Sequence, residues 1–425
     1  MLERARMKRL LPVLLLAAAC GNAPAPAEDL PLGDRLPEDE KADSSTWGAA
    51  LTCKTAPSLP SLTSPRITIS LDGLTLHLQD PATGFDKVYP VGVGTINADK
   101  TSANFGESET YEPLLGGKQD YQITPSSIQP CKFWWTDPDT GKQSPVFAGL
   151  PFMSWDGPYA VHGPVDNFTA ANGGNLRRGF VSHGCVRMEA ADVLEVYARI
   201  KSVKATPVHI QREPERGSDG RRVDIPQRWV GAECAADGDC NFTGGFCAHN
   251  RYSDRGFCSA RCTQYCNDAA GQPTTFCVAD PNDATEGLCV PKMIPQDQDC
   301  RNYDHFVTRT VARFKQPTVK ASVCVPGSPG WVGDHCFAAA DCLNGTRCLG
   351  ATASQAGICT ESCARYCADE PGWPTTFCAA DPLGNTCLRE CTPASNASEC
   401  PADSTCVARA RVSDSKTTKY VCDPI

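Results

Sequence analysis

The stretch FVSHGCVRMEAADVLEVY, residues 180–197, places His183, Gly184 and Cys185 side by side in the chain. A cysteine attacks a carbonyl carbon as its thiolate, so it needs a nearby base or cation that lowers the pKa of the thiol. Gly184 permits a tight turn, and the N–H groups of Gly184 and Cys185 would then donate to the oxyanion that forms in acyl transfer. The stretch therefore predicts a nucleophilic cysteine.

A second histidine is available as the general base. His162 ends the segment PYAVHG, residues 158–163, which has the pattern of a short strand, and Gly163 follows it. An imidazole is the side chain best suited to proton transfer near neutral pH. A helix expected to begin near Met188 would add the positive end of its dipole. A lone Cys–His pair is more often structural, so the hypothesis depends on these features occurring together.

Most other cysteines have the pattern of structural disulfides. Of the 26 cysteines, 22 lie beyond residue 228, in segments rich in glycine, proline and aspartate and poor in aliphatic residues. Such a count is typical of an oxidising compartment, where cross-links stabilise small folds by restricting the unfolded chain. Zinc binding is the alternative, but the spacings lack the paired Cys-x2-Cys motifs of zinc sites. We therefore expect disulfides and no metal.

Four cysteines precede residue 229, and counting them singles out Cys185. Cys20 is the expected site of lipidation, for the reasons given below. Cys53 and Cys131 flank the first half of a β-rich segment, which a disulfide between them would staple. Cys185 is then left over, and we expect it to keep a free thiol.

The N-terminus has the features of an export signal. Four basic residues, the last of them Arg9, precede an apolar run from Leu10 to Ala19 that is too short for a stable membrane span. The run ends in LAAAC, which resembles the lipobox of bacterial lipoproteins, so residues 1–20 are predicted to be a lipoprotein-type signal segment lipidated at Cys20. An ordinary signal cleaved after a small residue such as Ala25 is the alternative. We expect a lipoprotein secreted across the inner membrane, located at the outer membrane, in the periplasm or at the cell surface.

The next segment and the overall charge exclude other classes of protein. Residues 21–50 are rich in proline, alanine and acidic residues, without an apolar period, which predicts a solvated linker. The formal net charge of −9 argues against a nucleic-acid partner, because binding to phosphates rewards positive charge.

Residues 51–213 have the pattern of a mostly β domain with one clear helix. The segment RITISLDGLTLHLQD, residues 66–80, alternates apolar and polar residues on either side of Asp72-Gly73, as in a β-hairpin. The other strands are expected at residues 87–95, 120–125, 158–163 and 206–212.

The helix is expected within EAADVLEVYARIK, residues 189–201. Ala191, Leu194 and Ala198 recur at helical spacing, and acidic residues occupy the first turn. Val193, Val196 and Tyr197 lie beside them on the expected apolar face. This helix directly follows the candidate nucleophile in the chain.

The C-terminal half repeats itself after a polar linker at residues 214–228. WVGAECAADGDC, from Trp229, returns as WVGDHCFAAADC, from Trp331, and CTQYCNDAAGQPTTFC returns as CARYCADEPGWPTTFC. The eight cysteines of each copy keep nearly the same gaps, which is the mark of an internal repeat. We expect two small disulfide-rich repeats, at residues 229–330 and 331–425.

These motifs, in this order, resemble the L,D-transpeptidase catalytic domain of the YkuD-like family. The resemblance covers roughly residues 60–212 and is carried by HGPVDNFTAANGGNLRRGFVSHGCVRM, residues 162–188, together with the opening hairpin and the YPVG segment at 89–92. It implies a YkuD-like β-sandwich. The chain lacks the TPTG turn that often precedes a strand in the family, and the cysteine-rich repeats are not its usual companions.

The resemblance implies a cysteine-dependent peptidoglycan L,D-transpeptidase. Cys185 would attack the stem peptide before its terminal D-residue, and an amine would resolve the thioester, which cross-links or remodels the cell wall. His162 would be the general base, with the Gly163 carbonyl orienting its ring. His183 would line the acceptor side or tune Cys185, and Gly184 would belong to the oxyanion hole.

The remaining site residues also follow from the resemblance. Ser182 would cap the turn beside the substrate, and Arg187 would bind a stem carboxylate through its planar fork. No metal or organic cofactor is needed, and carbapenems typically acylate the family. The partners implied are peptidoglycan stem peptides and, through the lipid at Cys20, a membrane.

Two other functions stay open from the residues alone. If water resolves the thioester, the same machinery is an L,D-carboxypeptidase. A non-enzymatic cell-wall-binding lipoprotein would instead rely on its repeats, which have a possible protein or glycan partner. A kept thiol beside two histidines favours an enzyme, because a binding module has no use for it.

Lipidation gives the first testable prediction. Cys20→Ser should release the protein into the soluble fraction, because the short apolar run cannot anchor the chain by itself. Cell fractionation and intact mass of the mature protein measure this. A mature wild-type chain that begins elsewhere and carries no acyl mass would refute it.

Overall fold

The computed structural model describes most of the chain from residue 51 to residue 424. The segments outside this description are 1–50, 100–105, 112–118, 137–139, 171, 254, 270–271, 281–282, 295–299, 304, 329, 344–345, 353–355, 370–372, 382–383, 394–399, 401–403 and 425. The predicted signal segment, Cys20 and the linker therefore lie outside the described residues. None of the helices in the described part is long and apolar enough to cross a membrane.

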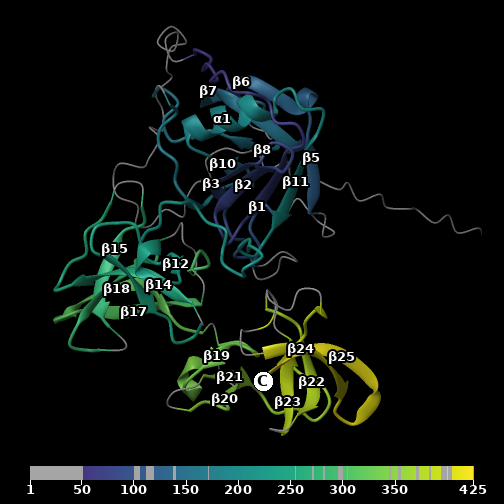
Figure 1. Ribbon diagram of the computed structural model, residues 1–425, viewed down its shortest axis with the longest axis vertical. Coiled ribbons are helices and arrows are strands. Elements are labelled where there is room, and N and C mark those ends of the chain that lie inside the picture. The colour runs from purple at the N-terminus through teal and green to yellow at the C-terminus, as the bar shows by residue number, and fades with distance from the viewer. Residues whose placement is uncertain are drawn as a thin grey trace, which may run out of the picture.

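The N-terminal domain consists of two β-sheets and the one α-helix of the described residues (Figure 1). The first sheet has the order β3 (Phe85–Pro90), β2 (Thr75–Asp80), β1 (Arg66–Ser70), β11 (Thr206–Gln211) and β5 (Asp120–Ile123). The second has the order β6 (Ile128–Thr136), β7 (Gln143–Asp156), β8 (Tyr159–His162), β10 (Val186–Arg187), β4 (Gly92–Gly94) and β9 (Gly179–Ser182). A short 3-10 helix, Pro125–Ser127, leads into β6.

Both sheets contribute to one apolar core. Ile69 and Leu76 from the first sheet, Val161 and Val186 from the second, and Val193 from the helix are all buried in it. The predicted hairpin is confirmed, since β1 and β2 pair antiparallel with Ile69 opposite Leu76. The alternation in the sequence arises because one face of each strand packs against this core.

The segment at 87–95 was expected as one strand and forms two. β3 pairs with β2 in the first sheet, whereas β4 pairs with β9 and β10 in the second. The chain changes sheets at Val91, which follows Pro90 and is fully buried. An apolar pattern marks such a residue as buried without indicating which sheet its neighbours join.

The longest strands of the domain were missed from the sequence. β6 and β7 pair antiparallel at the edge of the second sheet, although β6 contains Pro130 and β7 contains Pro145 and Pro151. The register of this pair shifts on both sides of Lys132, so bulges and the edge position accommodate the prolines. Prolines inside a run normally argue against a strand, which explains the omission.

The helix α1 spans Ala190–Ile200, within the predicted segment. Its buried side chains are Ala190, Val193, Val196, Ala198 and Ile200, while Ala191 is exposed. Val193, Val196 and Ala198 of the expected face are buried, and the expectation was wrong for Ala191. The helix packs against β7, and turning the valines and the isoleucine inward buries more apolar surface than Ala191 would.

The predicted disulfide between Cys53 and Cys131 is present and closes a loop of 78 residues. It holds the segment before β1 against the start of β6. Next to it, the Lys54 amide donates to the Gly149 carbonyl at 2.9 Å. The staple therefore fixes the edge of the second sheet to the N-terminal segment.

The cysteine-rich region consists of short antiparallel sheets. The first set is β12 (Glu233–Cys234), β13 (Gly245–His249), β14 (Gly256–Cys262), β15 (Thr275–Ala279), β16 (Gly287–Pro291) and the hairpin β17 (Phe306–Arg313) and β18 (Gln316–Pro326). The second is β19 (His335–Cys336), β20 (Arg347–Leu349), β21 (Gly357–Thr360), β22 (Thr376–Asp381), β23 (Gly384–Arg389) and the hairpin β24 (Ser404–Arg411) and β25 (Asp414–Pro424). The 3-10 helices Asp237–Asp239 and Ala339–Asp341 occupy equivalent places.

All 22 cysteines of this region are paired, which confirms disulfides over zinc. Within each group of four, the first cysteine joins the third and the second joins the fourth. The pairs of the first repeat are 234–247, 240–258, 262–277, 266–289 and 300–324. Those of the second are 336–348, 342–359, 363–378, 367–387, 391–406 and 400–422.

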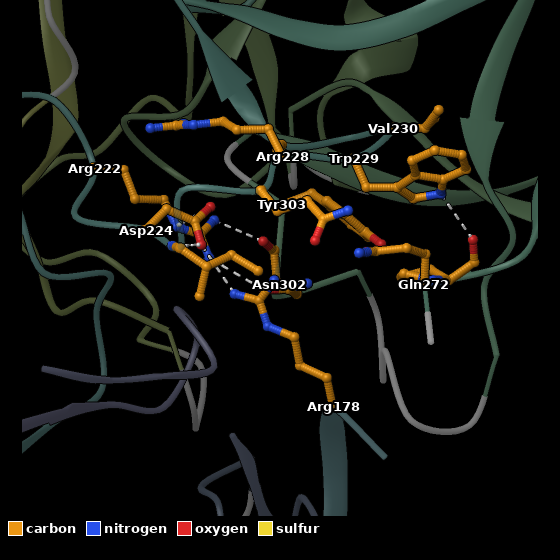
Figure 2. Close-up of a pocket in the computed structure, with 13 residues that line it drawn as sticks. Arg178, Arg222, Asp224, Arg228, Trp229, Val230, Gln272, Asn302 and Tyr303 are labelled. Atoms are coloured by element: carbon orange, nitrogen blue, oxygen red, sulfur yellow. Dashed lines mark hydrogen bonds and ion pairs between the residues drawn. The ribbon is translucent and has the colours of Figure 1, made fainter. Parts of the chain in front are cut away.

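A buried charged contact joins the N-terminal domain to the first repeat (Figure 2). Arg222 donates to the Gly73 carbonyl at 2.8 Å and to the Asn302 carbonyl at 2.7 Å, while Arg178 also reaches Gly73 and pairs with Asp224 at 3.0 Å. Burial alone would raise the pKa of Asp224, but Arg178 and Arg222 hold it below its usual range. Because Arg178 directly precedes β9, this contact ties the strand that leads into the Ser-His-Gly-Cys motif to the first repeat.

The contact borders a partly open pocket of about 20 Å³, lined by both arginines and by Trp229 and Gln272. This is room for about one water molecule. None of the residues predicted to do chemistry lines it. It belongs to the junction and has no space for a peptide substrate.

Candidate active site

The Ser-His-Gly-Cys motif crosses over the end of a strand. β9 and β10 are consecutive in the chain, but β4 lies between them in the sheet, so residues 182–185 pass from one side of β4 to the other. β10 then pairs parallel to β8, with Val186 opposite Val161 and Arg187 opposite His162. This pairing brings His162 beside the motif. The sequence predicted that these two segments contribute to one site.

Alternation along these two strands sorts the side chains into a core face and a site face. Val161 and Val186 lie in the main core. Ala160 and Cys185 belong to a separate cluster with Phe147, Phe152 and Val165. Since successive side chains of a strand point to opposite faces, the side chains on the site face are those of Ala160, His162, Cys185 and Arg187.

Gly184 has no tolerated substitute in the turn. Its φ of +96° lies in the left-handed region, and a Cβ atom there would be 2.4 Å from Cε1 of Tyr159 and 3.0 Å from the Glu109 carbonyl oxygen. The buried Ser182 hydroxyl donates to the Cys185 carbonyl at 2.6 Å. The predicted cap is thus present, and it engages the Ser182 hydroxyl within the turn.

His162 is buried with only one of its ring nitrogens bonded. Nδ1 lies 2.6 Å from the Gly163 carbonyl oxygen, so it is the protonated nitrogen of the neutral ring, and Nε2 has no hydrogen-bond partner. Phe147 contacts the imidazole edge-on, with the two ring centres 5.1 Å apart, and Phe152 stacks on it, with the ring centres 5.8 Å apart. The predicted contact with Gly163 is present, and it leaves Nε2 with a lone pair.

The pKa of His162 is lowered to about 3. Burial is the main cause, the Arg187 guanidinium is the next, and Lys132 adds to it, while the bond to Gly163 works in the opposite direction. An imidazole near its ordinary pKa had been expected. The aromatic surroundings and two cations disfavour the imidazolium, so the ring stays neutral at physiological pH.

Arg187 is a buried cation on the same face. It is 9% exposed, its Nε has no hydrogen-bond partner, and within the described residues no ion pair joins it to a carboxylate. Burial and the nearby Arg177 lower its pKa to about 10, and Asp166 opposes this shift. A buried guanidinium with spare donors is suited to an anion that binds from outside.

His183 has a carboxylate partner that the sequence did not reveal. Its Nδ1 lies 3.1 Å from Oε2 of Glu109, and both side chains are partly exposed. Glu109 is held over β4, because the neighbouring Ser108 and Thr110 hydroxyls bond to the backbone of Gly94. Nothing in the local pattern predicts this pair, since it depends on how residues 106–111 fold across β4.

Cys185 is fully buried, with Sγ 3.6 Å from the Pro158 carbonyl oxygen. It is disulfide-bonded, and none of the described cysteines is free. The expectation of a free thiol is therefore wrong for this structure. The counting argument had set Cys20 aside as the lipidated residue, and Cys20 lies outside the described part of the chain. Counting the cysteines of the N-terminal part alone therefore does not exclude a disulfide at Cys185.

The fold and site define a β-sandwich domain with a Cys–His site on one sheet. Residues 66–210 match the model of the YkuD family, described as the L,D-transpeptidase catalytic domain. This range contains His162, His183, Gly184, Cys185 and Arg187. Members of the family are cysteine-dependent L,D-transpeptidases.

Solved structures similar to the chain include two L,D-transpeptidases. One is from Xylanimonas cellulosilytica, with 18% identity over 37% of this chain and 64% of that one, at a TM-score of 0.23. The other is from Stackebrandtia nassauensis, with 12% identity over 37% of this chain and 60% of that one, at a TM-score of 0.22. The chain thus spans less than two thirds of either. No curated protein matches it.

The electrostatics of the site predict how His162 titrates. The ring should stay neutral across roughly pH 5 to 8, because burial and Arg187 disfavour its charged form. Arg187→Gln should raise its pKa, and Arg199→Gln, on the far helix, should not. Ring chemical shifts followed by NMR during a pH titration measure this. A wild-type midpoint near 6.5 would contradict the proposed environment.

Proposed function

We propose that the protein is a peptidoglycan L,D-transpeptidase that uses Cys185 as its nucleophile and His162 as its general base. The match of residues 66–210 to the family model supports the reaction class. The observation that carries the residue assignment is the His162 ring: it is buried and neutral, with its free nitrogen on the face it shares with Cys185.

The first half of the reaction is acylation. Only the thiol form of Cys185 can react, so its disulfide must first be reduced by exchange with an external dithiol, which is itself oxidised to a disulfide. Nε2 of His162 then takes the thiol proton, and the sulfur attacks the stem-peptide carbonyl that precedes the terminal D-residue. The N–H groups of Gly184 and Cys185 stabilise the oxyanion. His162 returns the proton to the departing amine, which leaves a thioester on Cys185.

Arg187 couples substrate binding to this proton transfer. A stem carboxylate that pairs with its guanidinium would satisfy a buried cation that now has spare donors. The same pairing would offset the charge that lowers the pKa of His162. The base would therefore become stronger when an anionic substrate is in place.

The second half needs a base for the incoming acceptor, and His183 is suited to it. With Nδ1 donating to Glu109, the lone pair of its imidazole is on Nε2. This nitrogen would remove a proton from an amine as the amine attacks the thioester. Water would be activated in the same way, so product analysis separates transpeptidation from the L,D-carboxypeptidase reaction.

Localisation follows from the predicted signal segment and the lipid at Cys20, which would hold the enzyme in the cell envelope beside its polymer. The alternative of a purely cell-wall-binding lipoprotein gives no role to a buried neutral base. We therefore rank it below the enzyme.

Acylation by a carbapenem tests the nucleophile and the first base. Wild-type protein should gain the mass of the drug on Cys185, and Cys185→Ala should gain none. His162→Ala should slow acylation by about 10²-fold or more, the usual worth of a positioned base. Intact-mass kinetics with and without a mild reductant measure this. His209→Ala, an exposed histidine paired with Asp120, is the matched control. Normal acylation in folded His162→Ala, with none in His183→Ala, would reverse the two roles.

The second base predicts a split between the two half-reactions. Glu109→Gln should leave acylation nearly unchanged but slow transfer to an amine by about tenfold or more, because the amide no longer fixes the tautomer of His183. His183→Ala should show the same split. Single-turnover acylation and transfer from the preformed thioester are measured separately. Glu107→Gln, in the same loop but paired with Arg212, is the control. Equal losses in both steps would show a merely structural role.

A further inference from the structure

The two cysteine-rich repeats carry the same pair of side chains, an exposed tyrosine stacked on a half-buried arginine. In the first repeat the pair is Tyr265 and Arg313, and in the second it is Tyr366 and Arg411. We call these the two Tyr–Arg sites. Nothing in the proposed catalytic reaction uses them.

The first Tyr–Arg site is rigidly built. Tyr265 lies between Cys262 and Cys266, whose disulfides lead to the paired strands β15 and β16. The guanidinium carbon of Arg313, the last residue of β17, is 4.6 Å from the centre of the Tyr265 ring and 4.9 Å from that of the buried Phe276. The arginine is thus held between an inner and an outer ring.

The second site repeats this arrangement. Tyr366 lies between Cys363 and Cys367, and Arg411 is the last residue of β24. The guanidinium carbon of Arg411 is 4.7 Å from the Tyr366 ring centre and 4.6 Å from that of the buried Phe377. Both arginines sit where the register of their hairpin shifts, so the backbone presents them in the same way.

Packing does not account for the outer rings. Tyr265 is 64% exposed and Tyr366 is 65% exposed, although tyrosine is a large side chain that folding would normally cover. Each ring stacks on a half-buried arginine, and one such contact is a weak reason to leave a large ring in solvent. Neighbouring exposed positions differ between the copies, as Thr263 and Ala364 do, yet both tyrosines are present.

Cations and carboxylates both lie near the two sites, and the charge of Arg365 reaches Asp414. The formal net charge is −9, but exposed Lys315 follows the first site closely in the chain, and exposed Arg365 adjoins Tyr366. Tyrosine and arginine together dominate many binding surfaces, because a rigid ring offers area and a guanidinium offers directed donors. Such a surface suits a ligand with both apolar faces and carboxylates.

We infer that the two Tyr–Arg sites bind peptidoglycan, with the tyrosine rings against its sugar rings and the arginines on its stem carboxylates. The choice of polymer rests on the proposed function. A repeating polymer can occupy both sites of one chain at once, which raises affinity without any new contact. The repeats would hold the enzyme on the polymer while the N-terminal domain reacts.

Co-sedimentation of the full chain with purified insoluble peptidoglycan tests the inference. A Cys185→Ala background excludes covalent capture. Tyr265→Ala and Tyr366→Ala should each weaken binding by about tenfold, as expected for an anchor residue. The double variant should weaken it by about 10² or more, because avidity is lost. Tyr420→Ala removes another exposed tyrosine, on β25, and should bind as before.

Two further measurements make each outcome decisive. Thermal unfolding and disulfide mapping show that the variants are folded, and Tyr→Phe at both sites should retain most of the binding. If the double variant sediments like its parent, or the parent does not bind, the inference is wrong. Carbapenem acylation of the double variant with Cys185 intact should equal that of wild type. Binding without acylation would overturn the proposed function and leave the Tyr–Arg sites standing.

Discussion

The site depends on one backbone constraint, the left-handed conformation of Gly184 where the chain crosses β4. Without that turn, β10 would not run beside β8, and Cys185 and Arg187 would not share a face with His162. The ring of Tyr159 and the Glu109 carbonyl fill the space where a side chain would be. A single residue without a Cβ atom thus links the order of strands in the sheet to the chemistry on its surface.

Burial and charge then decide what each histidine can do. His162 is enclosed by two phenylalanines and lies near two cations, which removes its positive form at neutral pH. His183 is partly exposed and has a carboxylate at its Nδ1. Two chemically identical side chains in one site therefore have different environments, which is the basis for proposing different roles for them.

The parts of the fold that the sequence predicted are those with a local cause. The β1–β2 hairpin and α1 follow from short-range periodicity, and the Cys53–Cys131 bond follows from counting and position. β6 and β7 were missed because their prolines are tolerated only through bulges and an edge position, which are properties of the finished sheet. Glu109 was missed for the same kind of reason, since its partner is 74 residues away. The bond at Cys185 was missed because a count cannot exclude one.

The disulfides of the cysteine-rich region all close within their own repeat, over 12 to 24 residues. A segment built in this way can be duplicated without leaving any sulfur unmatched. The two hairpins show that a repeat can also gain or lose two cysteines together. Cys406 faces Cys422 in the second repeat, whereas Thr308 faces Cys324 in the first. The first repeat accordingly has one disulfide fewer. The disulfide framework therefore limits how this region can change in evolution. A whole repeat can be gained or lost, or two bonded cysteines together, without leaving an unpaired thiol.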